Sequence, residues 1–473
     1  MIKSRAWYGS KFHVVYTLVV FVVLASLDNA AIRLIPSMVP QLTETFGVST
    51  FAIGALTAVQ VIVTAVTAVG WGYLADGGTR KRLLFWGTII WSAAMVGSGF
   101  TTTFWALFAF QALAGVGLGS IASVGFSVIS DFVAPKRRGL AMSFWGLSQG
   151  IGALAGTLLA SQAGATSHTI PFLILAFAGF FFAMLYVVTF EPPRGYAEPE
   201  LADLYEAGEE YEHTIDRDQI SELAQVRTNR WLILQGLTAQ IAYGSLIWAP
   251  LLYQEKVIAE GYSPMTGQRV GGWFTFFFAA GALFSILAGH IGDRWQRKNL
   301  SGRAYVSAIG VLGAIPFFLL FFWIPLRGLE VTEGASSFVL LGEVLVAIFT
   351  NPWVTASFVS VILAIALTSA DSPNWFALMS DVNLPEHRGT IFGSAEVVNG
   401  IGRGTGALLT TATAETLNKT IPPPFNLAIS LSVFQIFFLP TGWCYWKASK
   451  TCPDDITTVR DTLTERASSV SNS

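Results

Sequence analysis

The chain has 473 residues, of which 53% are hydrophobic and only 12% are charged. A water-soluble domain carries roughly a quarter of its residues as charged side chains, so this chain cannot cover itself with polar surface. Apolar runs of about twenty residues, the length of a helix that crosses a bilayer, recur from one end to the other. The composition therefore excludes a soluble globular protein and predicts a multi-pass helical membrane protein.

Twelve of the apolar runs are suited to cross the membrane. We expect spanning helices near residues 14–35, 51–74, 83–100, 105–130, 140–160, 170–190, 231–253, 270–291, 305–326, 354–379, 390–411 and 425–446. The first run is too long for a signal peptide and lacks a small-residue cleavage site, so we expect it to be retained. A thirteenth apolar segment, 336–353, would reverse the membrane orientation of all later segments if it crossed the bilayer. We interpret it as an interfacial or re-entrant insertion.

Lysines and arginines indicate the orientation of the chain. Of those that fall outside the predicted spans, 22 lie on the side that holds both termini and four lie on the other side. Because cytoplasmic loops carry the excess of such residues, we expect both termini in the cytoplasm and the protein in a plasma or inner membrane.

The middle of the chain differs from the rest in charge. Residues 191–230 hold eleven acids against four arginines and open with a proline pair. Such a segment is typical of a solvated linker. We therefore divide the chain into a six-helix half at 1–190, this acidic cytoplasmic linker, a second six-helix half at 231–447 and a cytoplasmic tail at 448–473.

An internal repeat supports two halves. GYLADGGTRKR at 72–82 is echoed by GHIGDRWQRK at 289–298, with the same spacing from glycine to aspartate to arginine. A second pattern, aspartate, proline, arginine and glycine at 131, 135, 138 and 139, recurs 250 residues later. Repeats of this kind indicate a duplicated helical bundle.

On these motifs the chain resembles the major facilitator superfamily over nearly its whole length. The resemblance implies an all-α membrane protein with twelve transmembrane helices in two pseudo-symmetric six-helix halves. It also implies a secondary active transporter that moves a small organic solute by alternating access. From the charged residues inside the spans we further expect an anionic or amphiphilic solute and protons as a coupling ion. The family's charged motifs act as a cytoplasmic gate, which here corresponds to Gly72, Asp76, Arg80, Asp131, Arg138, Asp293, Arg297, Asp381 and Arg388. Gly72 would let two helices approach closely. The alternative is that the bases only fix topology.

Ionisable side chains inside the predicted spans are the candidates for a transport site, because burying charge in a membrane is costly. They are Asp28, Arg33, Asp371, Glu396 and Arg403. At 1.5 Å per residue, the first, third and last lie about 15 to 22 Å from the cytoplasmic edge. Two interpretations remain open. In one, Asp28 or Glu396 neutralises Arg403 in a buried salt-bridge network. In the other, Arg403 and Arg33 hold an anionic substrate and Asp28 exchanges a proton.

Neutral polar residues at similar depth extend the candidate site. They are Asn29, Gln111, Gln149, Gln240 and Tyr243, with Gln60, Gln235 and Asn374 as further members; Trp145 and Trp375 could line a cavity. Each polar residue alone could equally form a hydrogen bond between helices.

Two motifs depart from family patterns. Gln111 stands where many proton-coupled members carry an arginine, and Ile151 stands where the antiporter motif has proline. Asp28 is similar to an acid of spinster-like and sugar-phosphate-type members. Leu118, however, stands where spinster-like proteins carry an acid, which disfavours that subfamily.

Other function classes lack support in the sequence. There is no P-loop, G-x-S-x-G or H-E-x-x-H pattern, and the two cysteines and five histidines show no metal-binding spacing. We expect no enzyme activity, cofactor, metal or nucleic-acid partner, and a monomer in the lipid bilayer that binds a small molecule. A non-transporting receptor or sensor on the same fold is the alternative. Asn418 begins a glycosylation sequon, relevant only where the organism glycosylates that face.

Overall fold

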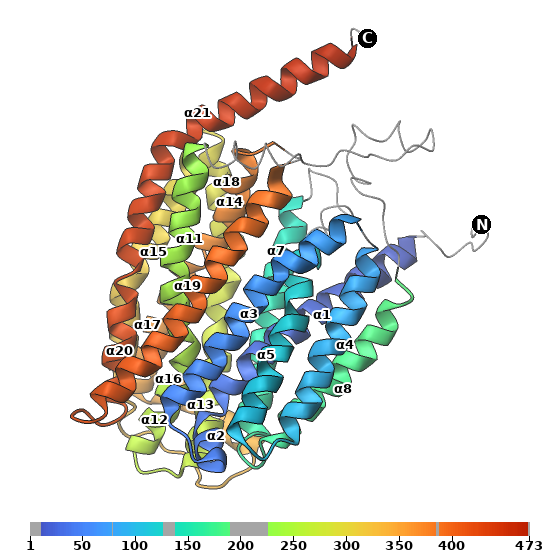
Figure 1. The fold of residues 1–473 in the computed structure, drawn as a ribbon. Coiled ribbons are helices and arrows are strands. Elements are labelled where there is room, and N and C mark those ends of the chain that lie inside the picture. Colours follow the sequence, from blue (N-terminus) through green and yellow to red (C-terminus); the bar gives the residue numbers. More distant parts are fainter. Residues whose placement is uncertain (1–10, 78, 126–137, 190–225, 385–386, 472–473) are drawn as a thin grey trace.

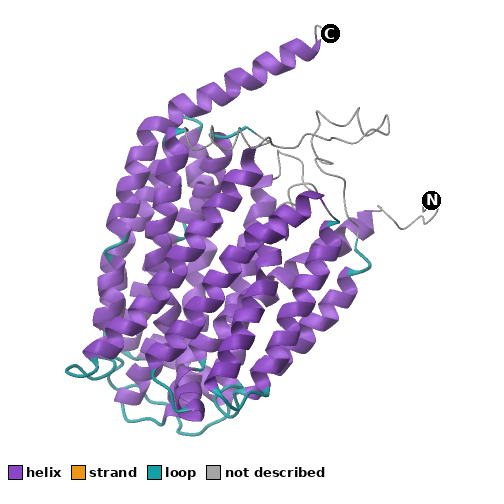
Figure 2. Ribbon diagram, in the orientation of Figure 1, coloured by secondary structure: helices purple, strands orange, loops and turns teal. Residues whose placement is uncertain are grey.

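The computed structural model describes residues 11–77, 79–125, 138–189, 226–384 and 387–471, and the regular elements in these ranges are helices (Figures 1 and 2). The helices form one bundle. Helix α1 begins, and helix α21 extends outward, at the same end of the bundle (Figure 1). We call this end the terminal side, and the opposite end, where the short helix α2 lies, the loop side.

Six helical segments form the first half. They are α1 (Lys11–Ser37), α3 (Thr50–Gly77), α4 (Arg80–Gly99), α5 (Phe104–Ser120) with the π-helical η1 (Ile121–Gly125), α7 (Arg138–Gln162) and α8 (Thr169–Tyr186). Helix α2 (Val39–Phe46) follows α1 and ends at Gly47, whose φ of 63° is readily adopted only by glycine.

Six further segments form the second half, and four of them are interrupted. They are α11–η4–α12 (Arg227–Ser245, Leu246–Trp248, Ala249–Ala259), α13–η5–α14 (Pro264–Phe278, Ala279–Leu283, Phe284–Gln296), α15 (Gly302–Trp323), α17–α18 (Pro352–Thr368, Asp371–Asp381), α19 (Arg388–Leu417) and α20–α21 (Phe425–Gln435, Phe438–Ser471). The predicted twelve helices in two halves are confirmed. Eight segments are long and apolar enough to cross a membrane by themselves; α4, α5, α7 and α19 complete the set.

A separate helix, α16 (Ser337–Thr350), lies between α15 and α17, where we expected an insertion. Its 14 residues extend about 21 Å, less than the roughly 30 Å of a bilayer core. Asn351 ends it and caps α17, because its side-chain oxygen accepts a hydrogen bond from the Trp353 backbone N–H at 2.9 Å.

The described helices extend beyond two of the predicted boundaries. Helix α11 begins at Arg227, not at 231, and α21 continues as a helix well past 446. The two extensions meet, because the backbone N–H of Thr228 donates to Asp455 Oδ2 at 3.0 Å. A carboxylate at a helix N-terminus satisfies a free N–H group and complements the helix dipole.

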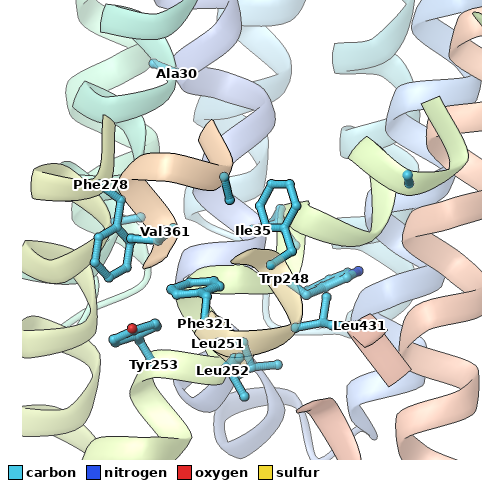
Figure 3. Packing of buried hydrophobic residues seen from close by; sticks show 14 of the residues in the cluster. Ala30, Ile35, Trp248, Leu251, Leu252, Tyr253, Phe278, Phe321, Val361 and Leu431 are labelled. Carbon is cyan, nitrogen blue, oxygen red and sulfur yellow. The ribbon is translucent and has the colours of Figure 1, made fainter. Parts of the chain in front are cut away.

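A hydrophobic core joins the two halves on the loop side. Ile35 of α1 lies beside Trp248 of η4, and Leu431 of α20 packs next to them (Figure 3). The indole N–H of Trp248 donates to the carbonyl of Ala407 at 2.8 Å, so the ring is held by both packing and a hydrogen bond. The halves are therefore tightly packed at this end.

Glycines let α3 and α19 pack closely from the loop side to the middle of the bundle. A Cβ at Gly54 would collide with Thr411, and one at Gly400 would collide with Ala65. Nearer the terminal side, a Cβ at Gly72 would lie 3.8 Å from Ser123 Cβ, an ordinary contact. Among the described residues the contact at Gly72 is thus an ordinary one, and the close approach expected there stays a prediction.

Candidate functional site

Arg403 is held by its neighbour on α11. The Nε of this half-buried arginine of α19 donates to Gln240 Oε1 at 2.8 Å. Gly244, one turn further along α11, packs directly against the backbone of Arg403. Among the described residues, neither Nη atom of Arg403 has an acceptor. The guanidinium is thus positioned by one bond and keeps its remaining donors for another ligand.

Arg33, on α1 of the other half, lies close enough to Arg403 for the two charges to repel. Arg33 is a half-buried residue of α1, and the charge of Arg403 acts on it repulsively. Within the described part of the chain, neither Arg33 nor Arg403 forms an ion pair, so no described carboxylate bridges them. Two like charges held near each other form a strong site for an anion, which would relieve their repulsion.

The alternative salt-bridge network is not formed among the described residues. Glu396 accepts only a long hydrogen bond, 3.4 Å, from Asn399 Nδ2. Neither carboxyl oxygen of Asp28 accepts a hydrogen bond of normal geometry from the described part of the chain. Neither acid neutralises Arg403 in this conformation.

Asp28 points into the first half of the bundle. Its side chain is 4% exposed and lies beside the indole of Trp91 on α4, whose Nε1 also makes no hydrogen bond within the described part of the chain. Asp28 and Arg33 are five residues apart, about 140° around α1, so they occupy different faces. Among the described residues, a carboxylate in this position has only the Trp91 indole N–H beside it to stabilise its charge.

Asp371 has a different environment. It is the first residue of α18, directly after the break between α17 and α18. Its carboxylate accepts hydrogen bonds from Gln235 Nε2 at 3.1 Å, from the Tyr243 hydroxyl at 3.0 Å and from the Tyr445 hydroxyl. These donors lie on α11 and α21, so Asp371 and Tyr243 join helices within the second half.

The remaining polar candidates do not gather at the two arginines. Gln111 donates to Ser98 Oγ at 2.8 Å between α5 and α4, and Asn29 donates to the Ala25 carbonyl within its own helix. Gln149 is exposed on α7. The Trp375 indole donates to the Leu232 carbonyl at 3.2 Å in a packed aromatic cluster. The side chain of Trp145 lies outside the described residues.

The predicted gate is described only in part. The side chains of Asp76, Asp131, Arg138 and Arg388 lie outside the described residues. Arg303 Nη2 pairs with Asp293 Oδ1 at 2.8 Å, and Nη1 pairs with Asp381.

Arg303 therefore links α14, α15 and α18 on the terminal side, a role that the sequence reasoning missed. Two features of the sequence could have predicted this role. The two repeated acids require a basic partner, and Arg303 lies at the start of the next helix. Arg297 is exposed and Arg80 is buried.

Five hydrogen bonds between described residues join the two halves on the loop side. They are Gln254 Nε2 to Ser37 O (3.2 Å), Gln268 Nε2 to Ala160 O (3.1 Å), Gln162 Nε2 to Arg269 O (2.9 Å), Ser337 Oγ to Gln162 Oε1 (2.6 Å) and Phe51 N to Glu415 Oε2 (3.0 Å). The loop side is closed by both polar and apolar contacts.

Comparisons with known proteins agree with this architecture. The family model of the Major Facilitator Superfamily matches residues 18–407. Protein spinster homolog 1 of Bos taurus is 29% identical over 311 residues, which cover 60% of this chain and 56% of that protein. The sphingosine-1-phosphate transporter SPNS2 of Danio rerio is 27% identical over 327 residues, 66% of this chain and 62% of that one. The chain thus spans less than two thirds of the length of either relative.

A solved structure shares the fold. A bacterial homolog of the human lysosomal transporter Spinster, in an inward-facing and unoccupied conformation, superposes with a TM-score of 0.70 at 19% identity, covering 94% of this chain and 99% of that one. The prediction from Leu118 that the chain is not spinster-like was wrong, because these relatives include spinster proteins. Leu118 is 2% exposed in the core of the first half, where a leucine fills apolar space.

Proposed function

The chain belongs to the Major Facilitator Superfamily and is a multi-pass membrane transporter of small solutes, not an enzyme; on this premise we propose that it carries an anionic amphiphile. The anionic group binds between Arg33 and Arg403, and a proton is exchanged at Asp28. The observation that carries this proposal is the pair of arginines, one from each half, with no carboxylate between them in the described part of the chain.

The position of the arginine pair suits alternating access. Arg33 belongs to the first half and Arg403 to the second, so an anion that contacts both bridges the two bodies that move. Gln240 holds Arg403 through Nε and leaves the two Nη groups for a bidentate contact, the geometry that arginine offers to carboxylate and phosphate.

An amphiphilic substrate is supported by the relatives. The Danio rerio relative is named for sphingosine-1-phosphate, a phosphate monoester joined to a long hydrocarbon chain. The arginine pair supplies charge for such a headgroup. The substrate class we propose is therefore a single-chain lipid with an anionic head.

The excess of basic residues on the terminal side supports a cytoplasmic location for that side and for both termini. With this orientation the closed loop side faces outward. We propose a monomer in a plasma or inner membrane, with halves at 1–190 and 231–447 that rock about the acidic linker and a charged gate on the cytoplasmic side.

Proton coupling is assigned to Asp28 because this acid is enclosed and, among the described residues, accepts no hydrogen bond of normal geometry. In this enclosed position the protonated, neutral carboxyl group is the more stable form. The charged carboxylate becomes more stable once the helices move and admit water. Loss and gain of the proton then follow the conformational change.

Transport in proteoliposomes tests the proposal. The purified protein is assayed with a pH-sensitive dye and a panel of single-chain phosphates, carboxylates, zwitterionic lipids and sugars. We expect Arg403→Ala to weaken the apparent affinity for the anion by about 10- to 100-fold, the value of a charge-assisted hydrogen bond. Arg403→Lys should restore part of it. Lys298→Ala, which removes an exposed charge from the terminal side, is the matched control. Wild-type affinity in Arg403→Ala would refute the anion site.

A further inference from the structure

The connection between α15 and α17 has no counterpart in the first half. The corresponding helices of the first half, α4 and α5, are joined by residues 100–103 alone. In the second half α15 ends at Trp323 and α17 begins at Pro352, and α16 lies between them on the loop side (Figure 1). We call this connection the 324–351 segment. It makes the loop side of the second half different from that of the first.

The 324–351 segment is fixed to the second half. Leu340 and Val344 of α16 are buried in the hydrophobic core, and α16 packs against α13 and α17. Hydrogen bonds to α13 and to the turn before it hold the segment, and they are Thr266 Oγ1 to Glu333 Oε1 (2.8 Å), Arg269 Nη1 to Ala335 O (3.2 Å), Trp273 Nε1 to Ser337 O (3.0 Å) and Tyr262 Oη to Leu329 O (2.8 Å). The segment is therefore a rigid part of the second half.

The last turn of α7, in the first half, contacts α13 directly. Gln268 Nε2 of α13 donates to the Ala160 carbonyl at 3.1 Å. This carbonyl is one of the last four of α7, which have no partner within their own helix. A Cβ at Gly272 would collide with Ser161 Oγ, so the two helices touch closely. The two halves thus meet at the end of α7.

Gln162, the last residue of α7, adds two contacts that reach both α13 and the 324–351 segment. Its Nε2 donates to the Arg269 carbonyl at 2.9 Å, and its Oε1 accepts a hydrogen bond from Ser337 Oγ at 2.6 Å. A glutamine amide can donate and accept at the same time. Ser337 is the first residue of α16, so the 324–351 segment contacts the opposite half at the start of its helix.

We propose that Gln162 and Ser337 form a lock that holds the loop side closed, and that the 324–351 segment brings Ser337 to the first half. Opening of the loop side separates α7 from α13, because these helices belong to the two halves that move against each other. Both contacts of the Gln162 amide then break, and their groups bond to water instead. The lock stabilises the closed conformation by the net value of two hydrogen bonds and so determines how often the loop side opens.

The lock is separate from the arginine pair and from Asp28. It requires only that the two halves move, so its test uses no substrate, and its failure would leave the anion site untouched. All chain segments that connect helices on the loop side lie within the described ranges. The contacts of the lock are therefore drawn from a fully described face of the protein.

Labelling of an introduced cysteine tests the lock. Ser37→Cys places a thiol on α1 at the loop side, where Ser37 is buried and its carbonyl accepts a hydrogen bond from Gln254 of the other half at 3.2 Å. Full-length protein in detergent is treated with a maleimide, and the labelling rate is proportional to the population that is open on the loop side. The native Cys444 and Cys452 are buried, so the chain without Ser37→Cys gives the blank.

All variants carry Ser37→Cys. Ser337→Ala should raise the labelling rate by about 2- to 10-fold, the net value of one neutral hydrogen bond. Gln162→Ala removes both contacts and should raise the rate by about 10- to 100-fold. The double variant should label at the rate of Gln162→Ala alone, because the Ser337 hydroxyl has then already lost this acceptor.

Two matched controls keep the result specific. Ser336→Ala changes the neighbouring, exposed serine, whose side chain makes no capping hydrogen bond to α16. Gln41→Ala removes another loop-side glutamine, whose amide donates to Thr45 within α2. Both variants should label at the rate of the parent protein.

The proposal is overturned by unchanged labelling in Gln162→Ala and Ser337→Ala, by additive effects in the double variant, or by an equal increase in Ser336→Ala. Labelling of Cys444 and Cys452 in Gln162→Ala would mean that this variant unfolds. Ser337→Ala, which removes a single hydroxyl group, then decides alone, and unchanged labelling in it overturns the lock.

Discussion

Two buried aspartates, one in each half, occupy opposite chemical environments. Asp28 on α1 is enclosed beside Trp91 with both oxygens lacking a hydrogen-bond partner among the described residues. Asp371 at the start of α18 accepts three hydrogen bonds, from Gln235, Tyr243 and Tyr445. The two are almost equally buried, at 4% and 6% exposure, so the difference lies in their donors and not in access to solvent.

This difference separates a coupling role from a structural one. Several donors offset part of the cost of burying a carboxylate's charge and tie together the helices that carry the donors. A buried carboxyl group with fewer donors is more stable in its protonated form until its surroundings change. We infer that Asp371 fixes the broken helix α17–α18 and that Asp28 is free to exchange its proton during transport.

The largest expected effect is the loss of proton coupling in Asp28→Asn. Asparagine has the size of the neutral acid, so we expect stability to stay within about 1 kcal/mol of wild type, as for substitutions that break no contact. Substrate-driven proton movement, followed with a pH-sensitive dye in proteoliposomes, should be abolished. Coupled transport in this variant would contradict the role of Asp28.

Removal of the Asp371 carboxylate should mainly affect stability. In Asp371→Ala, three buried donors lose their acceptor, and each unsatisfied group costs roughly 1–3 kcal/mol. We expect a clear fall in the thermal unfolding midpoint in detergent, with proton coupling retained by the protein that stays folded. Normal stability would show that the three hydrogen bonds are not formed.

Removing a single hydrogen-bond donor to Asp371 should lower the stability less than removing the carboxylate. A hydrogen bond to a charged group contributes about 1.5–3 kcal/mol, so Tyr243→Phe and Tyr445→Phe should each destabilise by that amount or less. In the background of Asp371→Asn, the effect of Tyr445→Phe should shrink. A double-mutant cycle measured by thermal unfolding shows this coupling, and additivity would contradict it.

The smallest effect concerns a carboxylate on the loop side, outside the spans. Hydrogen bonds from Ser263 and Thr266 lower the pKa of Glu333 below its usual range. A lowered folded-state pKa contributes stability above the ordinary glutamate range, which is lost as the pH falls through the folded-state value.

Glu333→Gln should therefore be slightly less stable than wild type at pH 7, and the difference should disappear in acid. The unfolding midpoints of both proteins across pH 7 to pH 4 test this. A difference that grows in acid would have the wrong sign.

The sequence predicted the architecture well because its signals are local. Apolar length marks the spans, the repeat marks the halves, and the charged motifs point to the family. The ends of α11 and α21 were harder to predict from the sequence, since they depend on a contact between Thr228 and Asp455 across 227 positions of sequence.

The site was predicted by residue type and depth, but not by direction. Depth placed Asp28, Asp371 and Arg403 at one level. Depth alone does not predict their contacts, because the rotation of each helix about its axis determines which neighbours a side chain contacts. Asp28 turns toward Trp91, Asp371 toward two tyrosines, and Arg403 toward Gln240. Only packing of the helices determines these rotations.

The most direct test is an infrared pH titration of the reconstituted protein that follows the carbonyl stretch of protonated carboxylic acids. Wild type, Asp28→Asn and Asp371→Asn are compared. The account predicts a buried acid band that is present in wild type and in Asp371→Asn and missing in Asp28→Asn. A band that persists in Asp28→Asn and vanishes in Asp371→Asn would contradict it.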